Sequence, residues 1–192
     1  MKATVAIALL LAPLCAAGDL HGKITCKGVR DSADAVVYVD TLPGKTFAPP
    51  AEHKVMDQKN LVFVPKVMPV LVGTTVDFKN SDAVLHNVFS PDACCDKFNL
   101  GTWPQGQSKS QKFDKVCNAT ILCKVHPEME AYVLAVPTPY FAVTKADGSY
   151  TIAGVPDGSV TVKVWHPKLK AQPKPATVEA GKAATVDFAL AR

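Results

Sequence analysis

The sequence predicts an all-β fold, and three observations support this prediction. Beyond an apolar N-terminal segment, hydrophobic and polar residues alternate in short runs, and no window longer than two turns carries a helical stripe. Turn-forming residues are frequent, with 15 Pro and 11 Gly in 192 residues. Turn signals separate the runs at close spacing, which is typical of β-sandwiches rather than of a parallel sheet. We therefore expect sandwiches built from short strands.

Composition excludes two classes of protein. The chain is 48% hydrophobic, so it can close a core, which excludes disorder. Its 21 basic and 17 acidic residues are interspersed, giving a formal net charge of +4, and this pattern excludes a nucleic-acid-binding arm. The length fits one large domain or two small ones.

Alternating segments bounded by turn residues give the expected strands. They are Gly22–Lys27, Ala35–Val39, Leu61–Val64, Thr75–Lys79, Val84–Phe89, Ala119–Cys123, Ala131–Val136, Phe141–Lys145, Ser149–Ala153, Val160–Trp165 and Ala184–Leu190. The segment Thr41–Glu52 contains three prolines and a glycine, and we expect a loop or a boundary there. In the tail, Asp147-Gly148 and Asp157-Gly158 each stand between alternating segments, which predicts two tight hairpin turns.

The N-terminus has the features of a secretory signal. Met1 and Lys2 precede an apolar run of about 12 residues, and small residues follow as far as Gly18. The run is interrupted by Pro13 and is shorter than the roughly 20 residues of a spanning helix, so we expect no membrane span. We predict a signal peptide over residues 1–18, cleaved after Ala17 or Gly18, and a periplasmic or secreted protein.

The loop after the strand Ala119–Cys123 carries a metal-ligand pattern. In Cys123-Lys124-Val125-His126-Pro127-Glu128-Met129 a thiolate, an imidazole and a thioether stand at positions i, i+3 and i+6. His86 offers a second imidazole. Two His and one Cys with a weak axial Met is the ligand set of a trigonal blue-copper centre. We therefore predict one type 1 copper ion bound by His86, Cys123, His126 and Met129.

Other readings of these residues remain open. Zinc also accepts Cys and two His, although a thioether is a poor fourth ligand for it. A Cys with a His three residues later also occurs as a nucleophile with its base, or by chance. The site is also compatible with another metal or with a relic that no longer binds one.

These motifs resemble the cupredoxin (blue copper) family, in particular its plastocyanin/amicyanin-like members. The resemblance rests on Leu85-His86-Asn87-Val88 and on the short loop Cys123–Met129, and it covers about residues 55–136. It implies a Greek-key sandwich with copper near one end. It also implies that Asn87 helps to tie the ligand loops together, that Pro127 lies beside the ligands, and that the imidazole of His126 reaches the surface and passes the electron.

When all the usual ligand positions of such a metal site are filled, no position is open for a substrate, and the site can carry out one-electron transfer. We therefore expect that the protein is not an enzyme. The expected function is an exported, monomeric carrier of single electrons that docks with a redox partner protein of unidentified nature and binds no nucleic acid. The alternative is a copper-binding or copper-delivery protein without redox turnover.

The number of cysteines leads to a second expectation, which concerns disulfides. The chain has six cysteines, and removal of Cys15 with the signal leaves five. With Cys123 on the metal, Cys26, Cys94, Cys95 and Cys117 remain as candidates for disulfides in an oxidising compartment. We expect Cys117 to pair with Cys94 or Cys95, and the other to reach Cys26. A second soft-metal site formed by Cys94, Cys95 and Cys117 is the alternative.

The tail resembles a second family. Thr144–Ile152 and Val155–Gly158 resemble carboxypeptidase regulatory-like (transthyretin-like) β-sandwich modules. Such modules begin with strands like Gly22–Thr25 and Ala35–Val39, which here precede the copper region. We therefore divide the chain into a signal peptide (1–18), N-terminal strands that belong to the C-terminal sandwich (19–54), a cupredoxin domain (55–136) and a second small β-sandwich (137–192).

Overall fold

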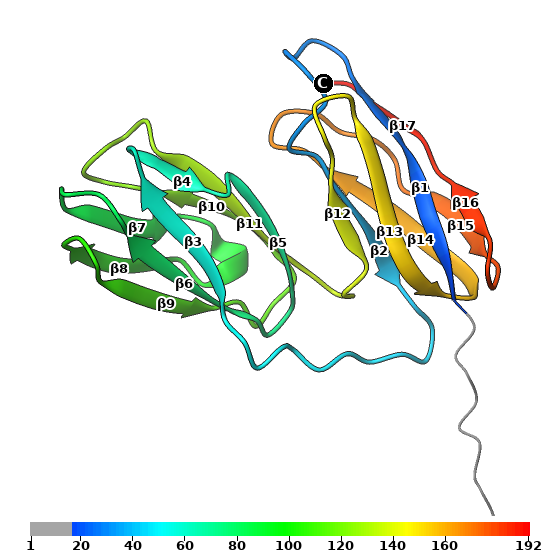
Figure 1. Ribbon diagram of the computed structural model, residues 1–192, viewed down its shortest axis with the longest axis horizontal. Coiled ribbons are helices and arrows are strands. Elements are labelled where there is room, and N and C mark those ends of the chain that lie inside the picture. Colours follow the sequence, from blue (N-terminus) through cyan, green and yellow to red (C-terminus); the bar gives the residue numbers. More distant parts are fainter. Residues whose placement is uncertain (1–16) are drawn as a thin grey trace, which may run out of the picture.

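The computed structural model describes residues 17–192 and confirms the all-β fold class. Most of the predicted signal peptide, including Cys15, lies outside the described residues. Within them, no helix is long and apolar enough to cross a membrane. Strands form two sandwiches, which stand side by side in Figure 1. We call residues 54–136 the inner sandwich, and residues 17–41 with 141–192 the outer sandwich.

The inner sandwich contains two sheets. One has the strand order β5-β11-β10-β7-β8 and the other has the order β4-β3-β6-β9. The strands are β3 (Lys54–Lys59), β4 (Val62–Val64), β5 (Val67–Leu71), β6 (Thr75–Asn80), β7 (His86–Ser90), β8 (Phe98–Trp103), β9 (Ser108–Lys112), β10 (Cys117–Leu122) and β11 (Glu130–Val136). A short 3₁₀ helix, η1 (Ala93–Cys95), connects β7 and β8. Aromatic, methionine and branched side chains between the sheets make one buried core.

The outer sandwich is built from both ends of the described chain. One sheet has the order β13-β1-β16, with β17 also pairing with β1, and the other has the order β12-β2-β14-β15. The strands are β1 (Ala17–Cys26), β2 (Val36–Thr41), β12 (Phe141–Val143), β13 (Ser149–Pro156), β14 (Gly158–Trp165), β15 (Lys174–Val178), β16 (Ala183–Thr185) and β17 (Phe188–Leu190).

The chain leaves the outer sandwich after β2 and returns to it after β11 (Figure 1). β1 pairs with β13 along most of its length, and β2 pairs with both β12 and β14. Ile24 and Val37 consequently lie in the core of the outer sandwich, with Val162 and Leu190. This topology is what an inserted inner domain requires, and on it we base the proposal that residues 55–136 interrupt a domain formed by 19–54 and 137–192.

Both Asp-Gly turns differ from the expected hairpins. β12 and β13, on either side of Asp147-Gly148, belong to different sheets, and so do β13 and β14 on either side of Asp157-Gly158. Each turn therefore carries the chain across the sandwich. Gly148 has a φ of 81°, and a Cβ there would lie 2.0 Å from the Ile24 carbonyl oxygen, so its turn also needs glycine for close contact with β1.

Several strands were not predicted from the sequence, and most of them lack an alternation of apolar and polar residues. They are β3, β5, β8, β9 and β15. In β3 the inward positions are Met56 and Gln58, and the buried amide hides the apolar pattern. The edge strand β9, Ser108–Lys112, is almost wholly exposed and has no apolar residue. Burial on one face is the signal for a strand, and β9 does not give it.

The two sandwiches share a small apolar contact. Its buried members are Val36, Val67, Leu134 and Val136, with Tyr38, Tyr132, Phe141 and Trp165 packed around them. The rings of Tyr132 and Trp165 are 5.1 Å apart between centroids, within the range of favourable aromatic pairs. At the edge of this contact, Lys66 Nζ lies 3.3 Å from Asp34 Oδ2.

Candidate metal centre

His86 is the first residue of β7, which lies between β10 and β8 in the five-stranded sheet of the inner sandwich. It lies opposite Trp103 of β8 and is fully buried. The preceding loop is fixed by Asn80, whose side-chain amide donates to the carbonyl oxygens of Val84 (2.8 Å) and Trp103 (3.0 Å). A buried imidazole needs polar partners on both ring nitrogens, so its neighbours define its role.

Asp82 supplies one of those partners. Its Oδ2 lies 2.9 Å from His86 Nε2, and its carboxylate also accepts the backbone N–H groups of Asn60 (2.7 Å) and Leu61 (2.9 Å). Burial raises the pKa of Asp82, but the hydrogen bonds from Leu61, His86 and Asn60 outweigh it and leave the pKa below its usual value. The ionised carboxylate favours a proton on His86 Nε2, which leaves the Nδ1 lone pair free to bind a metal.

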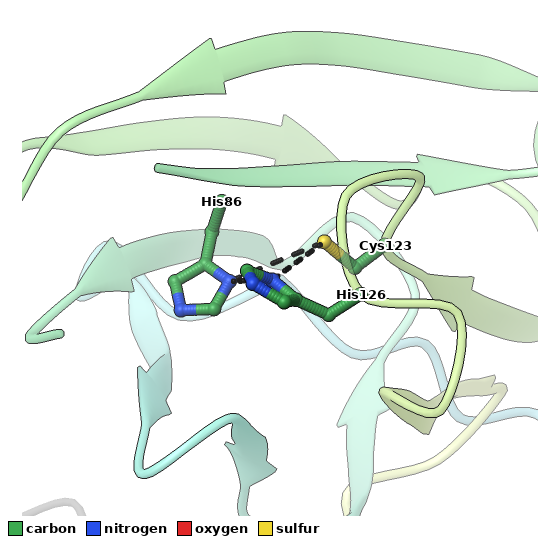
Figure 2. Close-up of side chains that lie close together, drawn as sticks. All are labelled: His86, Cys123 and His126. Atoms are coloured by element: carbon green, nitrogen blue, oxygen red, sulfur yellow. Dashed lines mark hydrogen bonds between the residues drawn. The ribbon is translucent and has the colours of Figure 1, made fainter. Parts of the chain in front are cut away.

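Cys123 and His126 come to the same point from the loop after β10. Figure 2 shows their side chains directed toward the ring of His86. Cys123 Sγ lies 4.0 Å from His86 Nδ1 and 3.9 Å from His126 Nδ1, and the two Nδ1 atoms are 3.1 Å apart. Cys123 is buried, whereas His126 is partly exposed. The three atoms therefore form a nearly isosceles triangle, with the two nitrogens closest together and with His126 at the vertex nearest the surface.

The triangle has the size that a bound metal ion requires. A point equidistant from the three atoms lies about 2.1 Å from each, the circumradius given by those distances. Metal–nitrogen bonds of about 2.0–2.1 Å and metal–sulfur bonds of about 2.3 Å are typical of such ligands, as zinc sites show. A soft thiolate with two imidazoles is a donor set that suits copper. The size and the donor set of this group therefore fit a bound metal ion.

Asn87 connects the segments that carry the ligands. Its backbone N–H donates to Cys123 Sγ at 3.4 Å, and its side-chain Oδ1 accepts the N–H of Lys124 at 3.2 Å. Its Nδ2 donates to Asn99 Oδ1 (2.9 Å) and to the Gly101 carbonyl (2.8 Å). One buried amide thus links β7, β8 and the loop after β10.

Met129 and Pro127 complete the predicted group. Met129 is buried in the same core cluster as Cys123, and its N–H donates to the carbonyl of His126 at 3.0 Å, which closes the ligand loop. Pro127 is exposed within that loop. Met129 also lines a cavity of about 360 Å³ with Val62, Phe63 and Glu128 among its other walls.

The other cysteines form one disulfide among residues 17–192. Cys94 pairs with Cys117, while Cys26, Cys95 and Cys123 are free. The expectation of a second disulfide to Cys26 is wrong, because Cys26 lies at the end of β1 in the outer sandwich and Cys95 is buried in the inner core. Since the disulfide uses two of the three thiolates, it also leaves no three-thiolate metal site in this state.

Sequence reasoning missed Asp82. Its signal is an acidic residue four positions before a histidine, which is common by chance in loops. What gives Asp82 its role is the contact with the turn at Asn60 and Leu61, where both residues have positive φ. That contact spans more than 20 positions of sequence and becomes visible only in the folded chain.

A family comparison matches residues 127–191 to the carboxypeptidase regulatory-like domain. The match includes β11 of the inner sandwich and omits β1 and β2. A search of curated proteins gave no match.

Among solved structures, the chain is similar to cupredoxins, so both resemblances recur in the comparisons. A copper(I) form of an amicyanin mutant shares 23% identity over 53% of this chain and 98% of its own, with a TM-score of 0.42. A purple cupredoxin from Nitrosopumilus maritimus shares 22% over 43% of this chain and 98% of its own (TM-score 0.39). A copper-containing nitrite reductase from Thermus scotoductus SA-01 shares 21% over 52% of this chain (TM-score 0.44), and the match spans only 25% of the reductase.

Proposed function

We propose that this protein is an exported type 1 copper protein that carries single electrons between redox partners. The observation that carries the proposal is the convergence of His86 Nδ1, His126 Nδ1 and Cys123 Sγ on one point about 2.1 Å from each. Met129, buried in the same core cluster as Cys123, is the fourth ligand in this proposal. Bound copper would supply a one-electron couple, because thiolate and thioether suit Cu(I) while imidazole also suits Cu(II).

The chain's own residues prepare the site for such a role. Asp82 holds the ring of His86, and Asn87 holds both the sulfur and the loop that follows it. Partners of this kind orient ligands and restrict their movement, which keeps the geometry similar in two oxidation states. The N–H of Asn87 at 3.4 Å from the thiolate stabilises negative charge on sulfur and thereby influences the potential.

An electron carrier rather than an enzyme is favoured by the number of ligands. Two imidazoles, a thiolate and the proposed thioether use the usual positions, and a catalytic site would keep one open for substrate. The Cys94–Cys117 disulfide is consistent with an oxidising compartment, as expected of a periplasmic or secreted protein.

His126 is our candidate for the point of electron exit. It is the partly exposed vertex of the ligand triangle. Next to the ligands in the sequence stand three exposed apolar side chains, Val84 (45% exposed), Leu85 (51%) and Val125 (46%). Apolar groups around an exposed ligand would allow a partner protein to approach without displacing charged side chains.

Copper titration tests the proposal. Cu(II) added to the purified protein is expected to give an intense visible thiolate-to-copper band at one equivalent, and Cys123→Ser to abolish it. Cys26→Ser, which changes a free thiol of the outer sandwich, is the matched control and should keep the band. Absence of the band in the wild type would contradict the proposed centre. A reversible couple with fast self-exchange supports a carrier, whereas copper transfer to an acceptor protein without redox turnover supports delivery.

A further inference from the structure

Three sulfur atoms gather at the end of β10 opposite the ligand loop. Cys94 and Cys95 lie in η1, Cys117 begins β10, and their Sγ atoms all lie within 4.8 Å of one another. Cys94 and Cys117 are disulfide-bonded, and Cys95 carries a free thiol. A free thiol within 4.8 Å of both disulfide sulfurs is near enough to attack one of them, because exchange proceeds by attack of a thiolate on a disulfide sulfur.

The surroundings of the two neighbouring cysteines differ. Cys95 is buried, with its Sγ 3.3 Å from the Asp92 carbonyl oxygen and 3.4 Å from Ser90 Oγ. It also lines a cavity of about 250 Å³ together with Phe98, Phe113 and Lys115. Cys94 is exposed. A thiolate leaving from position 94 would therefore be solvated, which favours its departure.

Chain connectivity selects one exchange product. A bond between Cys94 and Cys95 would close a ring across a single peptide bond, which demands unusual backbone geometry. A bond between Cys95 and Cys117 joins two buried side chains that already contact the same core and keeps η1 fastened to β10. The second pairing is thus the one that the fold accommodates.

We propose that Cys94, Cys95 and Cys117 form a thiol–disulfide exchange site that opens Cys94 to modification by low-molecular-weight disulfides. The Cys95 thiol releases its proton to water, and its sulfur attacks Cys117 Sγ. The Cys94–Cys117 bond breaks, the Cys95–Cys117 bond forms, and Cys94 leaves as a thiolate, with no net oxidation. The Cys94 thiolate then attacks a small disulfide, forms a mixed disulfide with one half and releases the other half as a thiolate.

Burial raises the pKa of the Cys95 thiol, and the charges of Asp92 and Asp96 add to this effect. Little of Cys95 is therefore thiolate at neutral pH, so exchange is slow there and faster at higher pH. The first step is internal to the chain and is independent of the proposed copper function.

Trapping with a maleimide tests the exchange. The full chain is incubated natively with N-ethylmaleimide at pH 8, quenched in acid and digested with pepsin, and fragment ions between residues 94 and 95 locate the label. The wild type is expected to accumulate label on Cys94 together with a Cys95–Cys117 linkage. Cys95→Ala keeps the native disulfide and lacks the attacking thiol, so its labelling at Cys94 should fall at least tenfold.

Three further outcomes decide the proposal. Label confined to Cys95, no label at either position, or equal labelling of Cys94 in both proteins would overturn it. Cys94→Ala supplies a measurement that does not depend on the Cys95 variant: glutathione disulfide should oxidise it to a Cys95–Cys117 disulfide with release of two glutathione thiols, and persistent free thiols at both positions would contradict the assigned product. Incubation with glutathione disulfide in place of the maleimide should give a mixed disulfide at Cys94 in the wild type and not in Cys95→Ala.

Discussion

The cores of the two sandwiches differ in chemistry. The inner core contains methionine, cysteine, tryptophan and phenylalanine side chains, among them Met56, Trp103 and Cys123. The outer core is mostly valine, leucine and isoleucine, and among residues 17–192 its buried members include no sulfur-containing side chain. Buried polar side chains follow the same division, since Gln58, Thr74, Asn80, His86, Asn87 and Ser90 all belong to the inner sandwich.

This difference shows in which sandwich the chain keeps buried polar side chains that are less favourable for stability than apolar ones. Each buried polar group must find partners or it destabilises the fold, and three of those in the inner sandwich, Asn80, His86 and Asn87, lie in or beside the proposed metal site. Asn80 and Asn87 satisfy loop backbone groups, and Asp82 satisfies a turn and an imidazole at once. In the outer sandwich, the hydroxyl of Thr144 bonds to the backbone of Ser32 and Ala35, and Thr138, just before β12, donates to the Val39 carbonyl. The other buried side chains of its core are almost all apolar.

Truncating one fully buried aliphatic side chain in each core gives the largest expected effect. Ile121→Ala in β10 and Leu190→Ala in β17 should each lower the free energy of unfolding by about 2–5 kcal/mol, because each leaves a cavity in a fully buried position. Ile121 stands two residues before Cys123, so its variant should also shift the visible band of the copper-loaded protein. Leu190→Ala should leave the band unchanged. Denaturant unfolding and absorption spectra measure both, and a band lost equally in the two variants would contradict independent roles.

Asp82→Asn tests the partner of His86. The neutral amide holds the imidazole less strongly and gives up one acceptor for the turn at residues 60–61, so copper affinity should fall about 10–100-fold. Asp77 is a matched control in the same sandwich, because its carboxylate lies 3.0 Å from the ring of the exposed His53. Competition with a chelator measures affinity. An equal loss in Asp77→Asn would show that Asp82 acts only through general charge.

Local sequence signals account for the parts of this fold and site that could be predicted. Alternation predicted the all-β class and the strand Val160–Trp165, which forms most of β14 and buries Val160 and Val162. The spacing of Cys123 and His126 on one loop brought two candidate ligands together before any fold was known. His86, 37 positions before Cys123, was added because its residue type completed a ligand set, and the structure brings it to the same point.

The rest depends on contacts that no local pattern records. The role of Asp82 arises from a turn on another strand. Gly148 and Gly158 have the positive φ typical of Asp-Gly turns, but the predicted hairpins do not form, because the sheet that receives the next strand is decided by packing of the whole sandwich. Cysteine parity likewise suggested two disulfides, and the separation of Cys26 from Cys95 between two cores allows only one of them.

Asn87→Ala and Thr144→Val compare one buried hydrogen-bonding side chain from each sandwich. Each should lower the free energy of unfolding by about 1–3 kcal/mol, since Lys124 N–H in one case and Ala35 N–H in the other lose their acceptor. Only Asn87→Ala should also change the visible band and the reduction potential, because it frees the loop that carries Cys123 and His126. Urea unfolding and voltammetry make the comparison, and a changed potential in Thr144→Val would contradict it.

The smallest expected effect concerns acid stability at the Asp147 turn of the outer sandwich. The N–H and hydroxyl of Ser149 donate to Asp147 Oδ1 at 3.0 and 2.7 Å and lower the pKa of that carboxyl. Its contribution is complete above the unfolded pKa of about 3.9 and is lost as the pH falls through the lower native pKa. The urea midpoint of Asp147→Ala should therefore lie below that of the wild type at pH 7 and approach it near pH 2.

Asp157→Ala alters the other Asp-Gly turn, where no such hydrogen bond to the carboxylate occurs within residues 17–192, and serves as the control. A wild-type advantage over Asp147→Ala that is equal at both pH values would mean that the carboxylate's charge contributes nothing to this turn.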